Sequence, residues 1–227
     1  NPYFEKYAKS GIKFITIDPQ YTEIAKKFNA EWIKIRPNTD VALMLGICHY
    51  LYTSNQYDKE FIEKYTFGFD KFLPYLLGRS EDMVEKTPAW AAKITGVEES
   101  VIKALVDTFV KNRTFLAGNW AMQRAHHGEQ ADWMLMVLAS MIGQVGLPGG
   151  GFGFSMHYGG GGQAFSGVSL PVGLPQGKNK VDAKIPASRV SEALLNPGKK
   201  IKFKGSEITY PDIKVMYIAG ATVLGHH

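Results

Sequence analysis

Two aspartates stand beside buried segments of the sequence, at places where α/β proteins bind ligands. Asp18 follows the apolar run from Ile12 to Ile17. Ligands bind beyond the carboxyl ends of strands in open sheets, where a carboxylate accepts both hydroxyls of a ribose, but Asp18-Pro19 also suits a simple turn. Asp40 opens a second apolar run. It either complements the helix dipole or accepts the ring N–H and exocyclic amine of guanine.

A second group of polar side chains follows a short apolar run at 114–117. It extends from Gly118 to Gln130 and contains Trp120, Gln123 and Arg124. Arg presents a rigid fork of donors and Trp an apolar wall, so the group is suited to a planar polar heterocycle or a phosphate. The alternative is that a strand-to-helix loop has collected caps and surface residues.

The histidine pairs and the single cysteine do not have the spacing of a metal or thiol site. His126-His127 and His226-His227 are adjacent pairs, whose rings project differently, and a mononuclear site needs three or four ligands. Cys48 lies in an apolar helical run, which indicates packing rather than a reactive thiolate. We therefore predict no metal ligand in this chain.

The elements that must position these residues alternate between strands and helices. Strand, helix and strand in the first 35 residues predict a βαβ unit with parallel strands. The alternation along the rest of the chain predicts an α/β fold. Strands are expected at 12–17, 32–35, 114–117 and 213–218, with a hairpin at 201–209. Helices are expected at 21–28, 41–52, 88 onward, 100–110, 128–144 and 189–195, with a pair in 58–77.

The stretch from Gly143 to Gly167 holds 11 of the 24 glycines of the chain. Glycine tolerates unusual backbone angles and close contact, so this segment is either mobile or pressed against a ligand. The two possibilities make opposite predictions about its order.

Composition narrows the class of protein. The 227 residues are 45% hydrophobic and 21% charged, which excludes global disorder, collagen and coiled coil. The longest apolar stretch, 133–143, is short of the roughly 20 residues that cross a bilayer, so we expect no membrane insertion. The net charge of +5 permits anionic ligands, but no motif for reading nucleic acid accompanies it.

Five phrases along the chain occur in the same order in one enzyme family. Taken together they resemble the molybdopterin oxidoreductases of the dimethyl sulfoxide reductase family. The phrases are Phe14–Pro19, Arg36–Leu43, Thr87–Ala92, Gln123-Arg124 with His127–Gln130, and Gly143–Phe154. The biotin sulfoxide and trimethylamine N-oxide reductase branch is the most similar, on the evidence of Tyr57–Lys59, Phe72–Gly78 and His157-Tyr158.

The resemblance implies a large enzyme that holds molybdenum between two pterin dithiolenes, each carrying a guanine dinucleotide. Such enzymes reduce S-oxides or N-oxides, among them biotin sulfoxide, dimethyl sulfoxide and trimethylamine N-oxide, by oxygen-atom transfer. The fold implied is a Rossmann-like three-layer domain with a mainly parallel sheet, extra helices and a glycine-rich loop. Residues 1–227 are then expected to be a central fragment, without the N-terminal metal-ligand segment or the C-terminal pterin-binding domain, and inactive alone.

The resemblance also implies roles for single residues. Asp18 contacts guanosine, Asp40 reads a guanine edge, and Trp120 and Arg124 face the substrate funnel as well as the pterin. The histidine pair at the end of the chain matches a histidine-rich turn, although Thr222 and Val223 replace its Asn-Pro. The full set of cofactor-binding positions is Asp18, Pro19, Asp40, Trp120, Met122, Gln123, Arg124, His226 and His227.

The resemblance also implies an electron donor and a cellular location, and the residues leave two other functions open. The electron donor is expected to be a c-type cytochrome or a cytoplasmic reductant, and the location the periplasm or, alternatively, the cytoplasm. A nicotinamide-dependent Rossmann dehydrogenase would use Asp18 as its nucleotide site, but no Gly-x-Gly-x-x-Gly precedes the first helix. A non-catalytic binding module would instead use the glycine-rich loop and the lysines at 199–204 to hold a partner.

Overall fold

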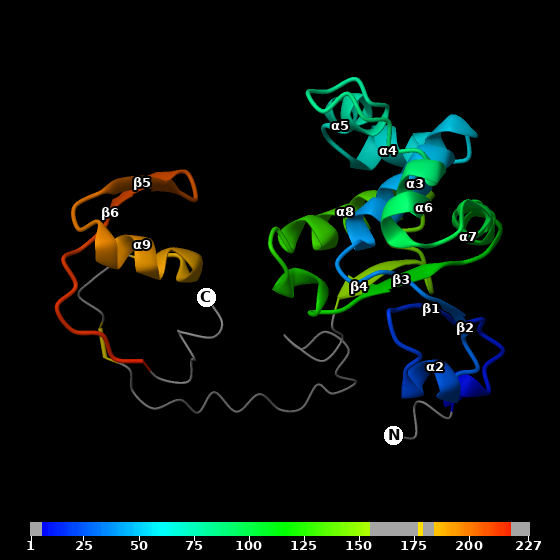
Figure 1. Cartoon of the computed structure of the whole chain (residues 1–227), viewed down its shortest axis with the longest axis horizontal. Helices are drawn as coiled ribbons and strands as arrows, with labels where there is room; N and C mark the ends of the chain where they lie inside the picture. The colour runs from blue at the N-terminus through cyan, green and yellow to red at the C-terminus, as the bar shows by residue number, and fades with distance from the viewer. Residues whose placement is uncertain (1–5, 155–176, 179–183, 219–227) are drawn as a thin grey trace. The chain divides into compact units, whose positions relative to one another are not determined.

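The computed structural model describes residues 6–154, 177–178 and 184–218, and the chain divides into two units (Figure 1). The first unit comprises residues 1–165 and the second residues 166–227. Each unit has its own hydrophobic core.

The first unit begins with the predicted βαβ arrangement. Strand β1 (Ile15–Ile17) pairs in parallel with β2 (Glu31–Ile33), and helix α2 (Glu23–Lys27) connects them. Thr22 caps the helix, because its hydroxyl oxygen accepts a hydrogen bond of 3.2 Å from the Ala25 amide. Ile15 and Ile17 pack against the core on one side of the strand. The parallel pairing confirms the crossover expected from the sequence.

Helix α3 (Asp40–Thr53) is the centre of the first unit. It is apolar nearly all round and buries nine residues, as its sequence predicts. Helices α6 (Pro88–Thr95), α7 (Glu99–Lys111) and α8 (Glu129–Ile142) pack against it. The crossing with α6 is close, since a Cβ on Gly46 would lie 2.5 Å from the Cβ of Ala91. Cys48 is fully buried, and its burial raises the pKa of the thiol, which confirms its packing role.

The amphipathic pair predicted in 58–77 forms helices α4 (Lys59–Tyr65) and α5 (Phe69–Leu76). Asp58 caps α4 by accepting a 2.8 Å hydrogen bond from the Phe61 amide. Thr87 caps α6 in the same way, with 3.1 Å to the Trp90 amide, as the Thr-Pro sequence predicts. An isolated β-bridge joins Leu77 to Glu85 in the connection between α5 and α6.

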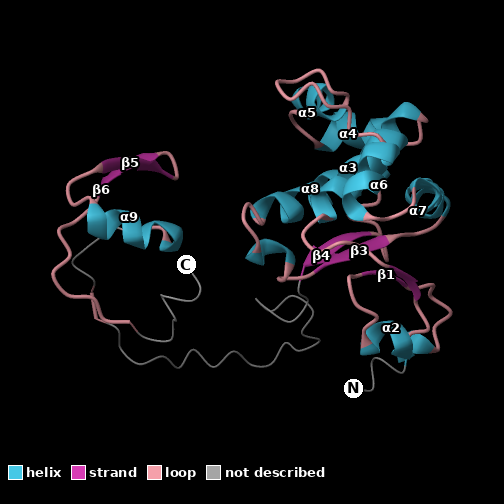
Figure 2. Cartoon of the chain, viewed as in Figure 1, coloured by secondary structure: helices cyan, strands magenta, loops and turns pink. Residues whose placement is uncertain are grey.

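A second parallel pair lies under α8 (Figure 2), formed by β3 (Phe115–Gly118) and β4 (Gly151–Phe154). The turn before β4 is packed against neighbouring backbone, because a Cβ on Gly150 would lie 2.8 Å from the Gln144 carbonyl oxygen. Gly151 has a φ of +86°, which favours glycine. Close packing at Gly150 and the positive φ of Gly149 and Gly151 therefore explain these glycines. The glycines at 159–167 lie outside the described residues.

The side chain of Gln144 fastens this second pair to the helices. Its amide nitrogen donates to the carbonyls of Phe109, at 3.2 Å, and Asn112, at 2.8 Å. Its oxygen accepts from the Thr114 amide at 2.7 Å. One side chain thus ties the end of α7 and the start of β3 to the end of α8.

The second unit contains a 3-10 turn, η2 (Ala187–Arg189), helix α9 (Val190–Leu195) and a hairpin of β5 (Lys200–Phe203) and β6 (Ser206–Thr209). The hairpin confirms the prediction. Its small core buries Ala193, Ile201 and Tyr210, and the Tyr210 hydroxyl donates to Glu192 at 2.9 Å. Lys199, Lys200, Lys202 and Lys204 are exposed.

Two expectations about strands need correction. Residues 213–218 do not form the predicted buried strand, and Val215 and Tyr217 are 87% and 92% exposed. A strand needs a neighbour to satisfy its N–H and C=O groups, and no described strand pairs with this segment. The expected sheet is also divided, in the described residues, into two parallel pairs and one hairpin. The α/β class itself is confirmed.

Candidate functional site

Asp18 lies where β1 ends, as predicted, and it does form a turn. Its Oδ1 accepts a 2.8 Å hydrogen bond from the Gln20 amide, the pattern of an Asx-turn. Its carbonyl oxygen accepts from the Trp32 indole at 2.9 Å. The residue is half-buried, and within the described part of the chain no hydrogen bond reaches Oδ2. One carboxylate oxygen therefore remains as an acceptor for a ligand.

Asp40 is the first residue of α3 and is half-buried. The residue before it, Thr39, makes no capping bond, because its hydroxyl donates to the Arg36 carbonyl at 2.7 Å. A negative charge in the first turn complements the partial positive charge of the helix N-terminus. No described residue bonds the Asp40 carboxylate, so its acceptors are also free for a ligand.

The polar segment after β3 forms a 3-10 turn, η1 (Met122–Arg124). Gln123 and Arg124 are exposed and Trp120 is 40% exposed, whereas Met122 packs against the core. The Asn119 side chain holds the entry to the turn by accepting a 2.7 Å bond from the Trp120 amide. Trp120, Gln123 and Arg124 are therefore all exposed on one short segment.

Two glycines fix this segment against its neighbours. A Cβ on Gly118, the last residue of β3, would lie 2.8 Å from the Phe154 ring and 2.9 Å from Leu135. A Cβ on Gly128 would overlap the backbone of Gln123. The segment is therefore held at both ends, and α8 starts in direct contact with η1.

Asp132 is a residue that our sequence interpretation missed. It lies on α8, and its Oδ1 is buried with no hydrogen-bond partner. Burial raises the pKa of this carboxyl group. The signal that could have revealed it is an aspartate set between Ala131 and the apolar run that begins at Trp133.

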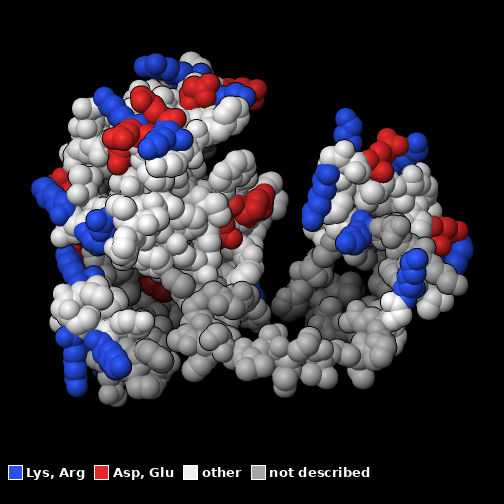
Figure 3. Space-filling view, turned by 180° about the vertical axis from the view of Figure 1, so that it is seen from behind, with Lys and Arg blue, Asp and Glu red and all other residues white. Residues whose placement is uncertain are grey.

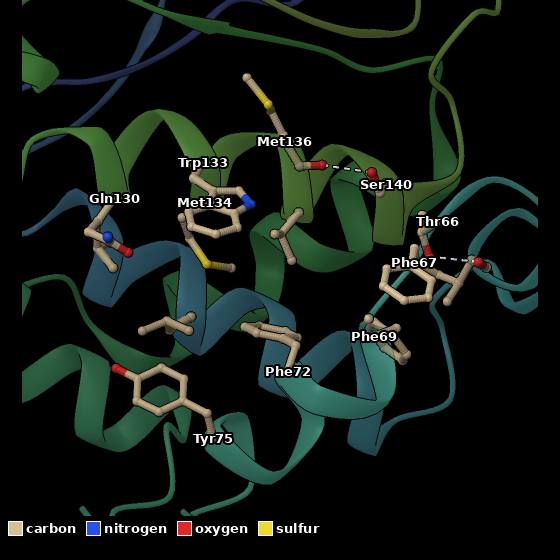
Figure 4. A pocket seen from close by; sticks show the side chains of 15 residues that line it. Thr66, Phe67, Phe69, Phe72, Tyr75, Gln130, Trp133, Met134, Met136 and Ser140 are labelled. Carbon is tan, nitrogen blue, oxygen red and sulfur yellow. Dashed lines mark hydrogen bonds between the residues drawn. The ribbon is translucent and has the colours of Figure 1, made fainter. Parts of the chain in front are cut away.

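An apolar pocket lies elsewhere in the first unit, between α3, the α4–α5 region and α8, with a volume of about 520 Å³ (Figure 4). Trp133, Met136, Val137 and Ser140 of α8 line it, whereas Met141 of the same helix is buried in the core. The hydroxyls of Thr66 and Ser140 donate to carbonyls of their own helices, so the walls are mostly apolar, with Gln130 and Tyr75 as further polar residues. Lining residues include Val41, Leu45, Phe69, Phe72, Trp133, Met136, Val137 and Ser140.

On the face that Figure 3 draws, the charged side chains of the described residues are mixed in sign. Figure 3 shows Lys and Arg on both units with acidic side chains among them, rather than one continuous basic strip. Within the described ranges, no three His, Cys, Asp or Glu side chains are grouped to hold a metal. None of the helices described is long and apolar enough to cross a membrane. His226 and His227 lie outside the described residues.

Comparison with known proteins identifies the family. The sequence model described as molybdopterin oxidoreductase matches residues 2–226. The chain belongs to the molybdopterin oxidoreductase family. This confirms the resemblance carried by the five phrases, and membership implies a molybdenum–molybdopterin cofactor.

Relatives of this molybdopterin oxidoreductase align with almost the whole chain. It is 49% identical to the trimethylamine-N-oxide reductase of Haemophilus influenzae, covering 99% of the chain and 28% of the relative. It is 46% identical to the dimethyl sulfoxide/trimethylamine N-oxide reductase of Rhodobacter capsulatus, covering 100% and 29%. The chain thus spans less than a third of the length of these relatives.

A solved structure supports the fold. Acetylene hydratase from Pelobacter acetylenicus superposes on this molybdopterin oxidoreductase chain with a TM-score of 0.50 and 27% identity. The superposition covers 60% of this chain and 18% of the acetylene hydratase chain. Both chains therefore share the α/β arrangement over that region.

The described residues suit the organic part of the cofactor. A pterin or a guanine presents ring N–H and amino donors, which carboxylates accept well. The structure supplies open carboxylate acceptors on Asp18 and Asp40, and a buried acceptor without a partner on Asp132. The acceptors of this molybdopterin oxidoreductase therefore match the donors of the group its family uses.

Proposed function

We propose that this chain is the cofactor-holding part of a molybdenum enzyme that reduces N-oxides or S-oxides. The observation that carries the proposal is 49% identity over 99% of the chain to a trimethylamine-N-oxide reductase. A dimethyl sulfoxide/trimethylamine N-oxide reductase at 46% identity supports both substrate classes. Biotin sulfoxide is a further candidate of the same chemistry.

The cofactor is proposed to be the bis(molybdopterin guanine dinucleotide) form. Asp18 offers its carboxylate to guanosine, with Pro19 beside it, and Asp40 offers its carboxylate to a guanine edge. Trp120, Gln123 and Arg124 offer an apolar wall and donors to the pterin, phosphate and substrate. The bound group supplies two-electron oxygen-atom chemistry, while the chain binds it, orients it and excludes water.

The surrounding architecture is part of the same proposal. The two parallel strand pairs, with helices against them, are consistent with a Rossmann-like three-layer domain in the whole enzyme. A c-type cytochrome or a cytoplasmic reductant would supply electrons, and the periplasm is the proposed location. Family membership sets aside the nicotinamide-dependent and non-catalytic alternatives.

The test is cofactor analysis of the full polypeptide that carries this chain, made in a host able to synthesise molybdopterin. We expect molybdenum with about two guanines per metal after acid release, and reduction of trimethylamine N-oxide or dimethyl sulfoxide by a reduced dye. The control is the same polypeptide from a host unable to make molybdopterin. Absence of both molybdenum and guanine from the first preparation would refute the proposal.

A further inference from the structure

We propose that Asp132 is a cofactor-binding residue, whose carboxylate accepts a hydrogen bond from the aminopyrimidinone edge of the bound cofactor. This inference rests on the proposed function. It adds a contact that neither the sequence phrases nor the similarity to relatives assigns.

The first step is the state of the side chain. Asp132 is half-buried, yet its Oδ1 is removed from solvent and has no hydrogen-bond partner. Buried polar atoms in folded proteins are almost always paired, because an unmade bond leaves the loss of hydration uncompensated. Desolvation also raises the pKa of the carboxyl group. Such an atom calls for a donor that arrives with a ligand.

The second step is its place on the helix. Residues 128, 132 and 135 lie on one face of α8, at spacings of four and three. Gly128 abuts the backbone of Gln123, and Leu135 abuts Gly118. Asp132 stands between these two contacts on the same face. It is therefore directed toward the segment 118–123, where the exposed Trp120 and Gln123 lie.

The third step is the class of ligand. An ionised carboxylate only accepts hydrogen bonds, so its partner must be a donor. An aminopyrimidinone edge offers a ring N–H beside an amino group, and this edge is shared by a pterin and a guanine. A metal ion is not favoured, since the described residues group no second and third ligand around Asp132. The chemistry therefore points to the organic part of the cofactor.

The test compares Asp132→Leu and Asp132→Asn in the full polypeptide, with Asp107→Asn as the matched control. Asp107 is a half-exposed helical aspartate 3.7 Å from Lys111, outside the segment at issue. Molybdenum and the fluorescence of oxidised pterin are measured per protein at limiting cofactor supply. We expect a roughly tenfold loss of both in Asp132→Leu, a smaller loss in Asp132→Asn, and none in the control.

Thermal unfolding of the cofactor-free protein supplies the second readout. Because Oδ1 has no partner without the cofactor, Asp132→Leu is expected to melt at the same temperature as the unsubstituted protein or higher. Loss of cofactor with retained melting supports the proposal. Unchanged loading, or a lower melting temperature of the cofactor-free variant, overturns it by showing no role or a structural one.

Two further comparisons distinguish a pterin donor from a guanine donor, and a failure of the proposed function from a failure of the role of Asp132. Loading with molybdopterin that lacks the nucleotide keeps the deficit of Asp132→Leu if the contact is to the pterin, and removes it if the contact is to guanine. If the unsubstituted polypeptide itself holds neither molybdenum nor pterin, the proposed function fails and this inference with it. If the unsubstituted polypeptide and the Asp132 variants load equally well, the function stands and the role of Asp132 is refuted.

Discussion

The turn before α6 buries a whole charged side chain and gives it partners, whereas the start of α8 buries one carboxylate oxygen and gives it none. Lys86 is 2% exposed, donates to the Asp82 carboxylate and the Val84 carbonyl, and lies 4.3 Å from the Tyr75 ring centre. Asp132 has a buried oxygen with no partner. Folding alone completes the first region, whereas a ligand completes the second on the proposal made above for Asp132.

The largest effect on stability should come from replacing the buried lysine in the turn before α6. Lys86→Ala removes buried methylenes beside Tyr75 and Trp90. It also removes the Lys86 donor from Oδ2 of Asp82 and from the Val84 carbonyl. We expect the free energy of unfolding to fall by about 2 kcal/mol, measured by urea denaturation. Lys111→Ala, at an exposed ion pair of 3.7 Å, should change it by less than about 0.5 kcal/mol. Equal losses in the two variants would show that Lys86 contributes no more than a surface lysine.

A smaller effect on stability is expected at the start of α8, accompanied by an effect on binding. Gly128→Ala places a methyl group against the Gln123 backbone and so displaces η1. We expect a loss of about 1 kcal/mol of stability and a severalfold lower molybdenum content. Gly146→Ala is the control, because its φ of +86° strains an alanine while no atom lies within 4 Å of the added Cβ. Equal molybdenum content in both variants would contradict a link between η1 and the cofactor.

The smallest effect concerns the stability of the folded protein at acid pH. The hydrogen bond from Lys86 lowers the pKa of Asp82 below its ordinary value of 3.8. A depressed carboxyl pKa contributes stability above the unfolded pKa, and this stability is lost as the pH falls through the folded pKa. Asp82→Asn should therefore weaken the pH dependence of unfolding below about pH 4 and leave it unchanged near neutrality. An identical acid profile in the variant would show that Lys86 does not hold this carboxylate.

The helices and their caps could be predicted from the sequence because they depend on local signals. The Thr87-Pro88 cap and the nearly all-apolar run of α3 formed as expected. The strands were harder, because a strand depends on a partner that is distant in sequence. Residues 213–218 have the pattern of a buried strand but no partner among the described residues.

The candidate site likewise has features that depend on local sequence and others that depend on distant segments. The positions of Asp18 and Arg124 followed from strand ends and loop composition. The sequence shows Asp132 beside an apolar run, but not that one of its oxygens lacks a partner, because whether a buried atom finds a partner depends on every element packed around it. Contacts between residues that are distant in sequence cannot be inferred from the residues on either side of a position.

The side chain of Gln144 has a consequence for the order in which the protein folds. Its three bonds reach back 30 to 35 residues along the chain, to Phe109, Asn112 and Thr114. Closing a loop of that length costs entropy before any bond forms, so the start of β3 gains this support only after α8 has docked. The segment that presents Trp120 and Arg124 should therefore be among the last parts of the first unit to acquire its shape, after the helices around α3.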